Sequence, residues 1–271
     1  MRRSIWMAKV LVVAAMMFAA HGIVLDAQVQ TFTTTVAGTR VVCRFIDDSV
    51  PFPRQTLLTF AGSADDSMSS AYTILSDILA AQHWFTISID LPAHGQDARP
   101  GEDPNPLVAW RQRTESQEDW IGTWMTRLSN VVTGLIDGGY SQPANILGVG
   151  HSRGAFMLDR VAAVDTRIKA VALVQPLTDL LRLTEWAGVL PTVAGPLNLM
   201  AVAPALASRP TYLTIGSEDQ RVGTDAALAF AWYISGWGGP WTWQVVPEAA
   251  PGHGPAPQIV LDQVALWLLQ Q

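Results

Sequence analysis

The pentapeptide Gly150-His151-Ser152-Arg153-Gly154 directly follows the apolar run Asn145-Ile146-Leu147-Gly148-Val149. That run is short and comes after the turn residues 141–143, so it predicts a buried strand. The segment 155–163 holds neither glycine nor proline and predicts a helix. A serine between a buried strand and a helix, with a glycine two residues away on each side, is typical of a nucleophile elbow. So tight a turn leaves no room for side chains at the two glycines and holds Ser152 in a strained conformation with its hydroxyl exposed.

The order of the candidate residues along the chain indicates the general base. In an elbow of this kind the serine is followed by an acid and then by a histidine. Of the five histidines, only His253 comes after Ser152. It lies in a loop rich in glycine and proline, between the strand-like segment 241–246 and a final helix-like segment. His253 is therefore the predicted base.

The acid is expected just beyond another buried strand, predicted over 211–216. Ligand sites in open parallel sheets gather at the carboxyl ends of the strands. Asp219 is the predicted acid, because the third position after Gly216 gives the loop room to turn the carboxylate back towards the histidine. Glu218 is the nearest alternative and is expected to face solvent. Asp179, after the strand-like segment 168–174, is a further alternative from a neighbouring strand end.

Two backbone amides are expected to form an oxyanion hole. One is the amide of Arg153, immediately after the nucleophile. The other is expected at the end of the strand predicted over 56–61, where Gly62 allows the substrate to approach the backbone closely and Ser63 supplies the N–H. Each donor is expected to contribute about 3–4 kcal/mol to transition-state stabilisation. His94, in the segment Asp90-Leu91-Pro92-Ala93-His94-Gly95, precedes Ser152 and is interpreted as a structural histidine that holds its loop.

The first 27 residues resemble a signal peptide. Arg2, Arg3 and Lys9 precede an apolar run from Val10 to Ala20, which is too short to span a bilayer comfortably, and cleavage is expected after Gly22 or Ala27. Residues 28–271 are then expected to form a single domain in a secreted or periplasmic protein, without stable membrane insertion after processing. Cys43 is the only cysteine, so an internal disulfide is excluded.

The composition of the chain limits the classes of ligand and partner that it is expected to bind. The net charge of −6 provides no basic stripe, which argues against a nucleic-acid partner. No histidine or cysteine cluster has metal-ligand spacing, so no zinc site and no other cofactor are expected. Among eleven tryptophans, Trp241 and Trp243 are the candidates for an aromatic wall around an apolar substrate group, with core packing as the alternative. A second group, Trp110, Trp120 and Trp124, has the same alternative readings.

Strand-like and helical segments alternate along the chain. Strands are predicted over 40–46, 56–61 and 84–91, with helices over 67–82 and 120–138. This alternation favours an α/β architecture: a mostly parallel, doubly wound sheet flanked by helices.

Together these features resemble the α/β-hydrolase superfamily over nearly the whole mature chain. The features are the Ala61-Gly62 strand end, the segment 90–95, the Ser152 elbow and the Asp219/His253 pair; the segments 152–154, 165–171 and 176–180 are similar to exported prolyl-oligopeptidase-like and esterase-type serine hydrolases. The chain departs from the commoner His-Gly pair at the oxyanion strand, where it has Ala61-Gly62. Residues 180–208 leave room for a small lid or none.

The resemblance implies a secreted serine hydrolase that cleaves small-molecule carboxylic esters through an acyl-enzyme. Two alternatives remain: a serine peptidase of prolyl-oligopeptidase-like type, and a non-catalytic exported binding protein with the same fold. The absence of a propeller-sized N-terminal domain favours the esterase over the peptidase, and the presence of all three triad residue types in order disfavours the binding protein.

Overall fold

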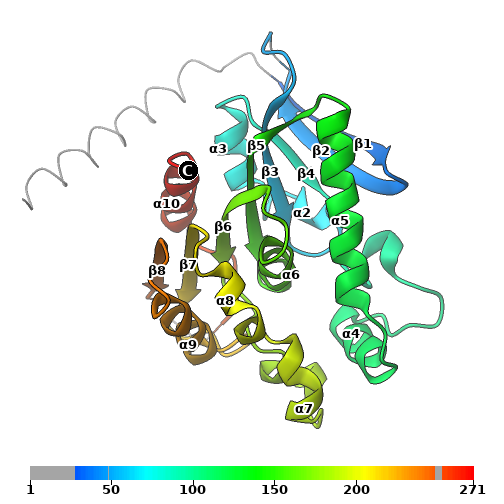
Figure 1. Cartoon of the computed structure of the whole chain (residues 1–271), viewed down its shortest axis with the longest axis vertical. Helices are drawn as coiled ribbons and strands as arrows, with labels where there is room; N and C mark the ends of the chain where they lie inside the picture. Colours follow the sequence, from blue (N-terminus) through cyan, green and yellow to red (C-terminus); the bar gives the residue numbers. More distant parts are fainter. Residues whose placement is uncertain (1–27, 48, 248–251) are drawn as a thin grey trace, which may run out of the picture.

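A single mixed sheet organises the molecule (Figure 1). The computed structural model describes residues 28–47, 49–247 and 252–271, so the expected signal peptide lies outside the described residues. Eight strands lie in the order β1-β2-β4-β3-β5-β6-β7-β8. Their bounds are β1 Val29–Val36, β2 Thr39–Ile46, β3 Arg54–Phe60, β4 Phe85–Ser88, β5 Ser141–His151, β6 Ile168–Val174, β7 Thr211–Gly216 and β8 Trp241–Val246.

The six strands β4, β3, β5, β6, β7 and β8 pair parallel with one another, whereas β2 pairs antiparallel with β1 on one side and β4 on the other. The central strands β3, β6 and β7 are almost wholly buried, as expected for a parallel sheet covered on both faces. This confirms the predicted mostly parallel α/β architecture.

Helices cover both faces of the sheet (Figure 1). The helices are α2 Ala64–Ser67, α3 Ile74–Ala80, α4 Pro106–Glu115, α5 Trp120–Asp137, α6 Arg153–Ala162, α7 Pro191–Ala194, α8 Ala203–Leu206, α9 Thr224–Ser235 and α10 Gln258–Leu268. Helices α3 and α10 share one hydrophobic cluster, whereas α4, α5, α6 and α9 contribute to a second and larger one. Among the described residues, none of the helices combines the length and the apolar character needed to cross a membrane.

The helix predicted over 67–82 is wrong in its extent. The structure has two short helices, α2 and α3, separated by residues 68–73. Ser69 lies in this break, where its hydroxyl donates to the carbonyl of Asp66 at 2.7 Å. A short polar side chain that bonds to nearby backbone competes with continued helix, which accounts for the interruption.

The segment between β6 and β7 forms a small excursion, which agrees with the expectation of a small lid or none. It contains short turns of 3-10 helix and the two four-residue helices α7 and α8. Leu180, Trp186 and Leu199 within this excursion are fully buried, so its inner side belongs to the core of the domain.

Candidate active site

Ser152 occupies the sharp turn between β5 and α6, at the carboxyl edge of the sheet. Its backbone has φ 54° and ψ −116°, a conformation that is strained for a residue with a side chain. A Cβ atom on Gly150 would lie 2.4 Å from the Cα of Ala155, and one on Gly154 would lie 2.0 Å from the carbonyl oxygen of Phe60. Both glycines are therefore required for the turn to pack against β3 and α6.

Hydrogen bonds to the neighbouring strand fix this turn. The Ser152 N–H donates to the carbonyl of Val174 at 2.9 Å, and the Ser152 carbonyl accepts from the N–H of Leu177 at 3.2 Å. Arg153 is the first residue of α6, so its own N–H has no acceptor within the helix. That amide and the positive end of the helix dipole lie beside Ser152, where they favour a negatively charged oxygen.

Asp219 and His253 form a hydrogen-bonded pair. His253 Nδ1 lies 2.7 Å from Asp219 Oδ2. The other carboxylate oxygen of Asp219 accepts from the N–H groups of Arg221 at 2.9 Å and Val222 at 3.1 Å. The Asp219 side chain is fully buried, whereas that of His253 is 21% exposed. Because Nδ1 donates to a carboxylate, Nε2 is left as the nitrogen that can accept a proton.

The pair and Ser152 belong to the same edge of the sheet. Asp219 follows β7 and Ser152 follows β5, and only β6 lies between these strands. Neighbouring strands lie about 4.8 Å apart, so two strand ends separated by one strand are about 10 Å apart, which places Ser152 and the pair close together at this edge. The loop that carries His253 is fastened at this edge by a hydrogen bond of 3.3 Å from the N–H of Gly252 to the carbonyl of Glu218.

The structure distinguishes among the three acids that the sequence offered. Asp179 accepts from the N–H of Leu181 at 2.9 Å and caps a short 3-10 helix. Glu218 is exposed, as expected. Of the three, Asp219 is the one hydrogen-bonded to His253.

The prediction that Ser63 supplies an oxyanion-hole amide needs correction. The Ser63 N–H donates to Asp66 Oδ2 at 3.1 Å and the Ser63 hydroxyl accepts from the Asp66 N–H at 3.0 Å, which is a capping box at the start of α2. The N–H groups of Ala61 and Ala64 are also engaged, by Ser67 and Asp90. Within the described part of the chain, Gly62 is the residue of this turn whose N–H has no acceptor. Gly62, one position earlier, is therefore the better candidate.

His94 holds its loop, as predicted. Its Nδ1 lies 2.8 Å from the carbonyl of Pro92 and its Nε2 lies 3.0 Å from Nη1 of Arg153. Burial and then the charge of Arg153 lower the pKa of His94 to about 4, so the ring is neutral at pH 7. A neutral ring with Nδ1 protonated donates to Pro92 and accepts from Arg153.

Sequence reasoning missed Asp90 in the same loop. Its carboxylate accepts from the N–H of Ala64 at 2.7 Å and of Gln96 at 3.0 Å, so it ties the loop after β3 to the loop after β4. A Cβ atom on Gly95, which has φ 51°, would lie 2.4 Å from Asp90 Oδ1. Asp90 is an acid near the end of a predicted buried strand, and this sequence feature could have identified it as a candidate site residue.

The prediction that Trp241 and Trp243 line the substrate site is wrong. In β8 these residues pair with Thr211 and Leu213, whereas the carboxyl edge of the sheet is at the pair Gly216 and Val246. Trp241 is partly buried, with its ring centroid 5.8 Å from that of Phe230 in α9, and Trp243 is 41% exposed on the edge strand. Register in the parallel sheet thus carries both rings away from Ser152.

The second tryptophan group, Trp110, Trp120 and Trp124, packs in the core and contacts the loop that carries His94. Trp110, Trp120 and Trp124 are buried, and the rings of the first two lie 4.7 Å apart. The indole N–H of Trp124 donates to the carbonyl of Asp90 at 2.9 Å, and that of Trp110 donates to the carbonyl of Pro92 at 2.5 Å. Two indoles therefore anchor the backbone of the loop that carries His94.

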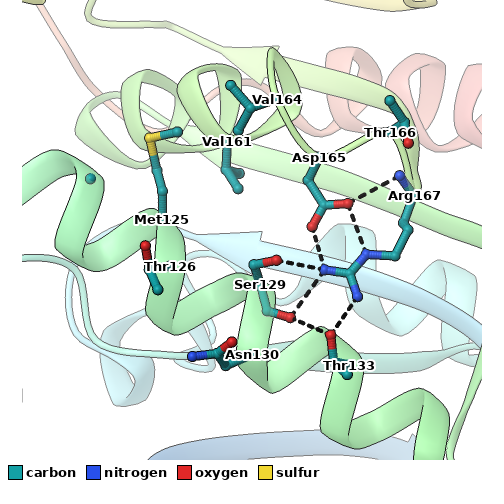
Figure 2. A pocket seen from close by; sticks show the side chains of 11 residues that line it. Met125, Thr126, Ser129, Asn130, Thr133, Val161, Val164, Asp165, Thr166 and Arg167 are labelled. Atoms are coloured by element: carbon teal, nitrogen blue, oxygen red, sulfur yellow. Dashed lines mark hydrogen bonds and ion pairs between the residues drawn. The ribbon is translucent and has the colours of Figure 1, made fainter.

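A cavity of about 630 Å³ between α5 and α6 is separate from this site (Figure 2). Arg167 in its wall bonds to both oxygens of Asp165 and to Ser129 and Thr133 of α5 (Figure 2). Arg167 precedes β6 at the amino edge of the sheet, whereas Ser152 follows β5 at the carboxyl edge, about 20 Å away along the seven residues of β6. The polar groups in this wall bond to one another and tie α5 to the loop after α6.

Comparison with known proteins identifies the fold. No protein-family model and no curated protein sequence matches the chain. Among solved structures, Thermus thermophilus TT1662 is 19% identical with a TM-score of 0.65, over 89% of this chain and 98% of its own. A cold-adapted esterase from an Arctic intertidal metagenomic library is also 19% identical with a TM-score of 0.65, over 91% and 94%.

Peptidases share the same architecture. Pyrococcus horikoshii acylaminoacyl peptidase is 13% identical with a TM-score of 0.65, over 91% of this chain and 42% of the peptidase. At these identities the likeness concerns architecture, and it agrees with the strand order and the helix layers described above. The chain has the α/β-hydrolase fold.

Proposed function

We propose that the protein is a serine hydrolase that cleaves carboxylic esters of small molecules through an acyl-enzyme. The observation that carries this proposal is the conjunction at one sheet edge of a strained Ser152 and the Asp219–His253 pair with its 2.7 Å hydrogen bond. The strained backbone of Ser152 costs free energy that packing alone does not require, and such strain clusters at functional sites. No cofactor takes part in the proposed reaction.

In the proposed mechanism, Ser152 attacks the ester carbonyl while His253 Nε2 accepts the hydroxyl proton. Asp219 keeps the imidazole in the required tautomer and stabilises the imidazolium. The amides of Arg153 and Gly62 hold the oxyanion. His253 then delivers the proton to the leaving alcohol, and a water molecule activated by the same ring hydrolyses the acyl-enzyme.

Likeness to two esterases supports an ester as the substrate. The Arctic esterase and the Pyrococcus furiosus esterase Pf2001 align over 91% and 90% of this chain. A peptidase of the same mechanism is the second candidate, supported by the likeness to acylaminoacyl peptidase. The two reactions differ in the leaving group, which is an alcohol in one and an amine in the other.

A fluorophosphonate probe tests the nucleophile. We expect stoichiometric labelling of the purified protein and no labelling of Ser152→Ala. Labelling of neither form, or of both equally, would reject the proposal and favour a non-catalytic binding protein.

Turnover of p-nitrophenyl butyrate against peptide p-nitroanilides distinguishes esterase from peptidase. We expect the ester to have the higher kcat/KM and Ser152→Ala to abolish its turnover. A peptide anilide with the higher kcat/KM would assign the protein to the peptidases instead.

We also propose that residues 1–27 direct export, so that the enzyme works outside the cytoplasm. The support is the basic start followed by the apolar run from Val10 to Ala20. N-terminal sequencing of the protein from its native cells should give a start at residue 23 or residue 28, which follow the two expected cleavage sites. An uncleaved Met1 in the extracytoplasmic fraction would instead indicate an N-terminal anchor.

A further inference from the structure

Arg153 differs from the other arginines around the candidate active site. Arg221 forms two hydrogen bonds with Glu185, of 2.6 and 2.8 Å, and Arg113 is paired with both Asp97 and Glu102. Arg153 is also partly buried, but its hydrogen-bond partner is the neutral ring of His94. No carboxylate in the described ranges forms an ion pair with it.

The free donors of Arg153 are accessible. A guanidinium group has five N–H donors, and the bond to His94 uses one of them. The other nitrogen atoms of its guanidinium are not wholly buried, so these donors keep some contact with solvent. A planar fork of free donors matches the two oxygens of a carboxylate.

The side chain lies among loops from several strand ends. Its charge interacts with Tyr72 and Asp66 from the segment after β3, with Glu185 after β6 and with Arg221 after β7. Asp66 is bound to the Ser63 N–H and Glu185 is bound by Arg221, so both acids are already engaged. Neither acid forms an ion pair with Arg153, so the positive charge of its guanidinium, one residue from the nucleophile, is only partly offset.

We propose that the Arg153 side chain binds a carboxylate of the substrate, so that the enzyme prefers esters that carry a negative charge near the scissile bond. This inference rests on the proposed function and names its substrate class. In the proposed complex, the backbone N–H of Arg153 binds the carbonyl oxygen of the ester and its side chain binds the carboxylate of the substrate. Partial burial strengthens such a charge-assisted pair, because solvent screens it less.

Matched esters test the preference on each side of the scissile bond. On the acyl side, p-nitrophenyl hemisuccinate is compared with p-nitrophenyl 4-methylpentanoate, in which an uncharged isopropyl group replaces the carboxylate. On the alcohol side, 4-acetoxybenzoate is compared with its methyl ester. For at least one pair we expect the ratio of charged to neutral kcat/KM to fall about 10- to 100-fold in Arg153→Gln, the range expected for one charge-assisted hydrogen-bonded pair.

The matched control is Lys169→Gln, which removes the same charge from an exposed residue of β6 near the amino edge of the sheet. Its ratio should equal that of the wild type. An equal loss for charged and neutral esters in Arg153→Gln would mean that Arg153 only holds the His94 loop, and would overturn the proposal.

Inhibition of the wild-type protein provides a second test, which does not depend on the folding of the variant. Hydrolysis of the neutral ester should be inhibited competitively by succinate and not by succinamide, and equal inhibition by the two would overturn the proposal. If the wild type hydrolyses neither ester and fluorophosphonate fails to label it, the proposed function fails by itself. Calorimetry with succinate then decides the carboxylate site: binding that is lost in Arg153→Gln supports it, and no binding to the wild type overturns it.

Discussion

Asp219 accepts three hydrogen bonds, two from backbone N–H groups and one from His253 Nδ1. The two backbone donors fix the orientation of the Asp219 carboxylate, so the oxygen that accepts from His253 Nδ1 is held in a defined position. Orientation of this kind is what a catalytic acid contributes in a serine hydrolase, since the acid itself is not protonated in the reaction.

Asp219→Asn should therefore lower kcat by about 10⁴-fold with little change in KM. The Asn amide keeps the shape of the side chain, but it can present an N–H to Nδ1 and favour the tautomer in which Nε2 carries the proton. Steady-state kinetics on the neutral p-nitrophenyl ester measures the effect.

Asp179→Asn is the matched control, because Asp179 caps a short helix and has no bond to His253. Its kcat should stay within about threefold of the wild type, since an Asn oxygen can cap the helix about as well as an Asp oxygen. A large loss of kcat in Asp179→Asn together with a mild Asp219→Asn would exchange the roles of the two acids.

Helix α6 is the element on which the site depends most. Gly154 in its first turn lies against the carbonyl of Phe60 in β3, where a Cβ atom would be only 2.0 Å away. The helix also carries Arg153 at its start and a fully buried acid, Asp159, at its middle. Its position relative to β3 therefore sets both the elbow and the oxyanion turn.

Gly154→Ala should lower the free energy of unfolding by about 1–3 kcal/mol, because β3 and α6 must separate to admit the methyl group. Denaturant unfolding measures it, and the proposed esterase activity should fall in parallel as the elbow shifts. Gly195→Ala is the control, since a Cβ atom there meets nothing within 4 Å. Equal stability of the two variants would contradict the close packing of α6 on β3.

Asp159 should make stability depend on pH. Burial raises the pKa of this carboxyl to about 8 from 3.8, while the charges of Arg209 and Arg160 act in the opposite direction. Between pH 4 and 8 the folded state keeps the proton and the unfolded state has lost it. The stabilisation is thus full below pH 3.8 and is lost as pH rises to 8, by about 1.4 kcal/mol per pH unit.

The isosteric variant Asp159→Asn should remove this contribution. Its free energy of unfolding should resemble that of the wild type near pH 4 and exceed it by about 5 kcal/mol at pH 8. Urea unfolding across this pH range measures the difference. Parallel curves for the two proteins would show that the carboxyl is ionised in the fold at neutral pH.

At the scale of the whole molecule, the parallel sheet decides which residues meet. Every residue that follows a parallel strand is brought to the carboxyl edge, and every residue near a strand start is carried to the other edge. Ser152 and Asp219 follow their strands, whereas Trp241 begins its strand. The candidate catalytic residues therefore lie at the carboxyl edge of the sheet, whereas Trp241 lies near the amino edge and contributes to packing.

Tryptophan variants test this separation. Trp241→Ala should lower the free energy of unfolding by about 2–3 kcal/mol because it leaves a space against Phe230, and the exposed Trp243→Ala should change it by less than about 1 kcal/mol. Neither should alter the ratio of kcat/KM between bulky and acetyl esters. A selective loss for bulky esters would restore these rings to the substrate site.

Much of the fold could be predicted because buried parallel strands read as short apolar runs. The strands over 168–174, 211–216 and 241–246 have the predicted bounds, and the helix over 120–138 is α5 to within one residue. The antiparallel strand β1 was not predicted, since its face is largely exposed and lacks such a run. The helix over 67–82 failed because the side-chain hydrogen bond of Ser69 to nearby backbone competes with the helix.

The sequence alone determined the fold class and the candidate nucleophile and base, and narrowed the acid to three residues, because glycines at a tight turn and the order of residue types are local or linear properties. Only the tertiary structure decided which acid reaches His253, which amide of the 61–64 turn is free, and that Trp241 and Trp243 lie away from Ser152. These outcomes depend on strand register and on competing hydrogen bonds, such as that of Ser63 with Asp66. Both are set by contacts between residues far apart in the chain, which a linear pattern does not record.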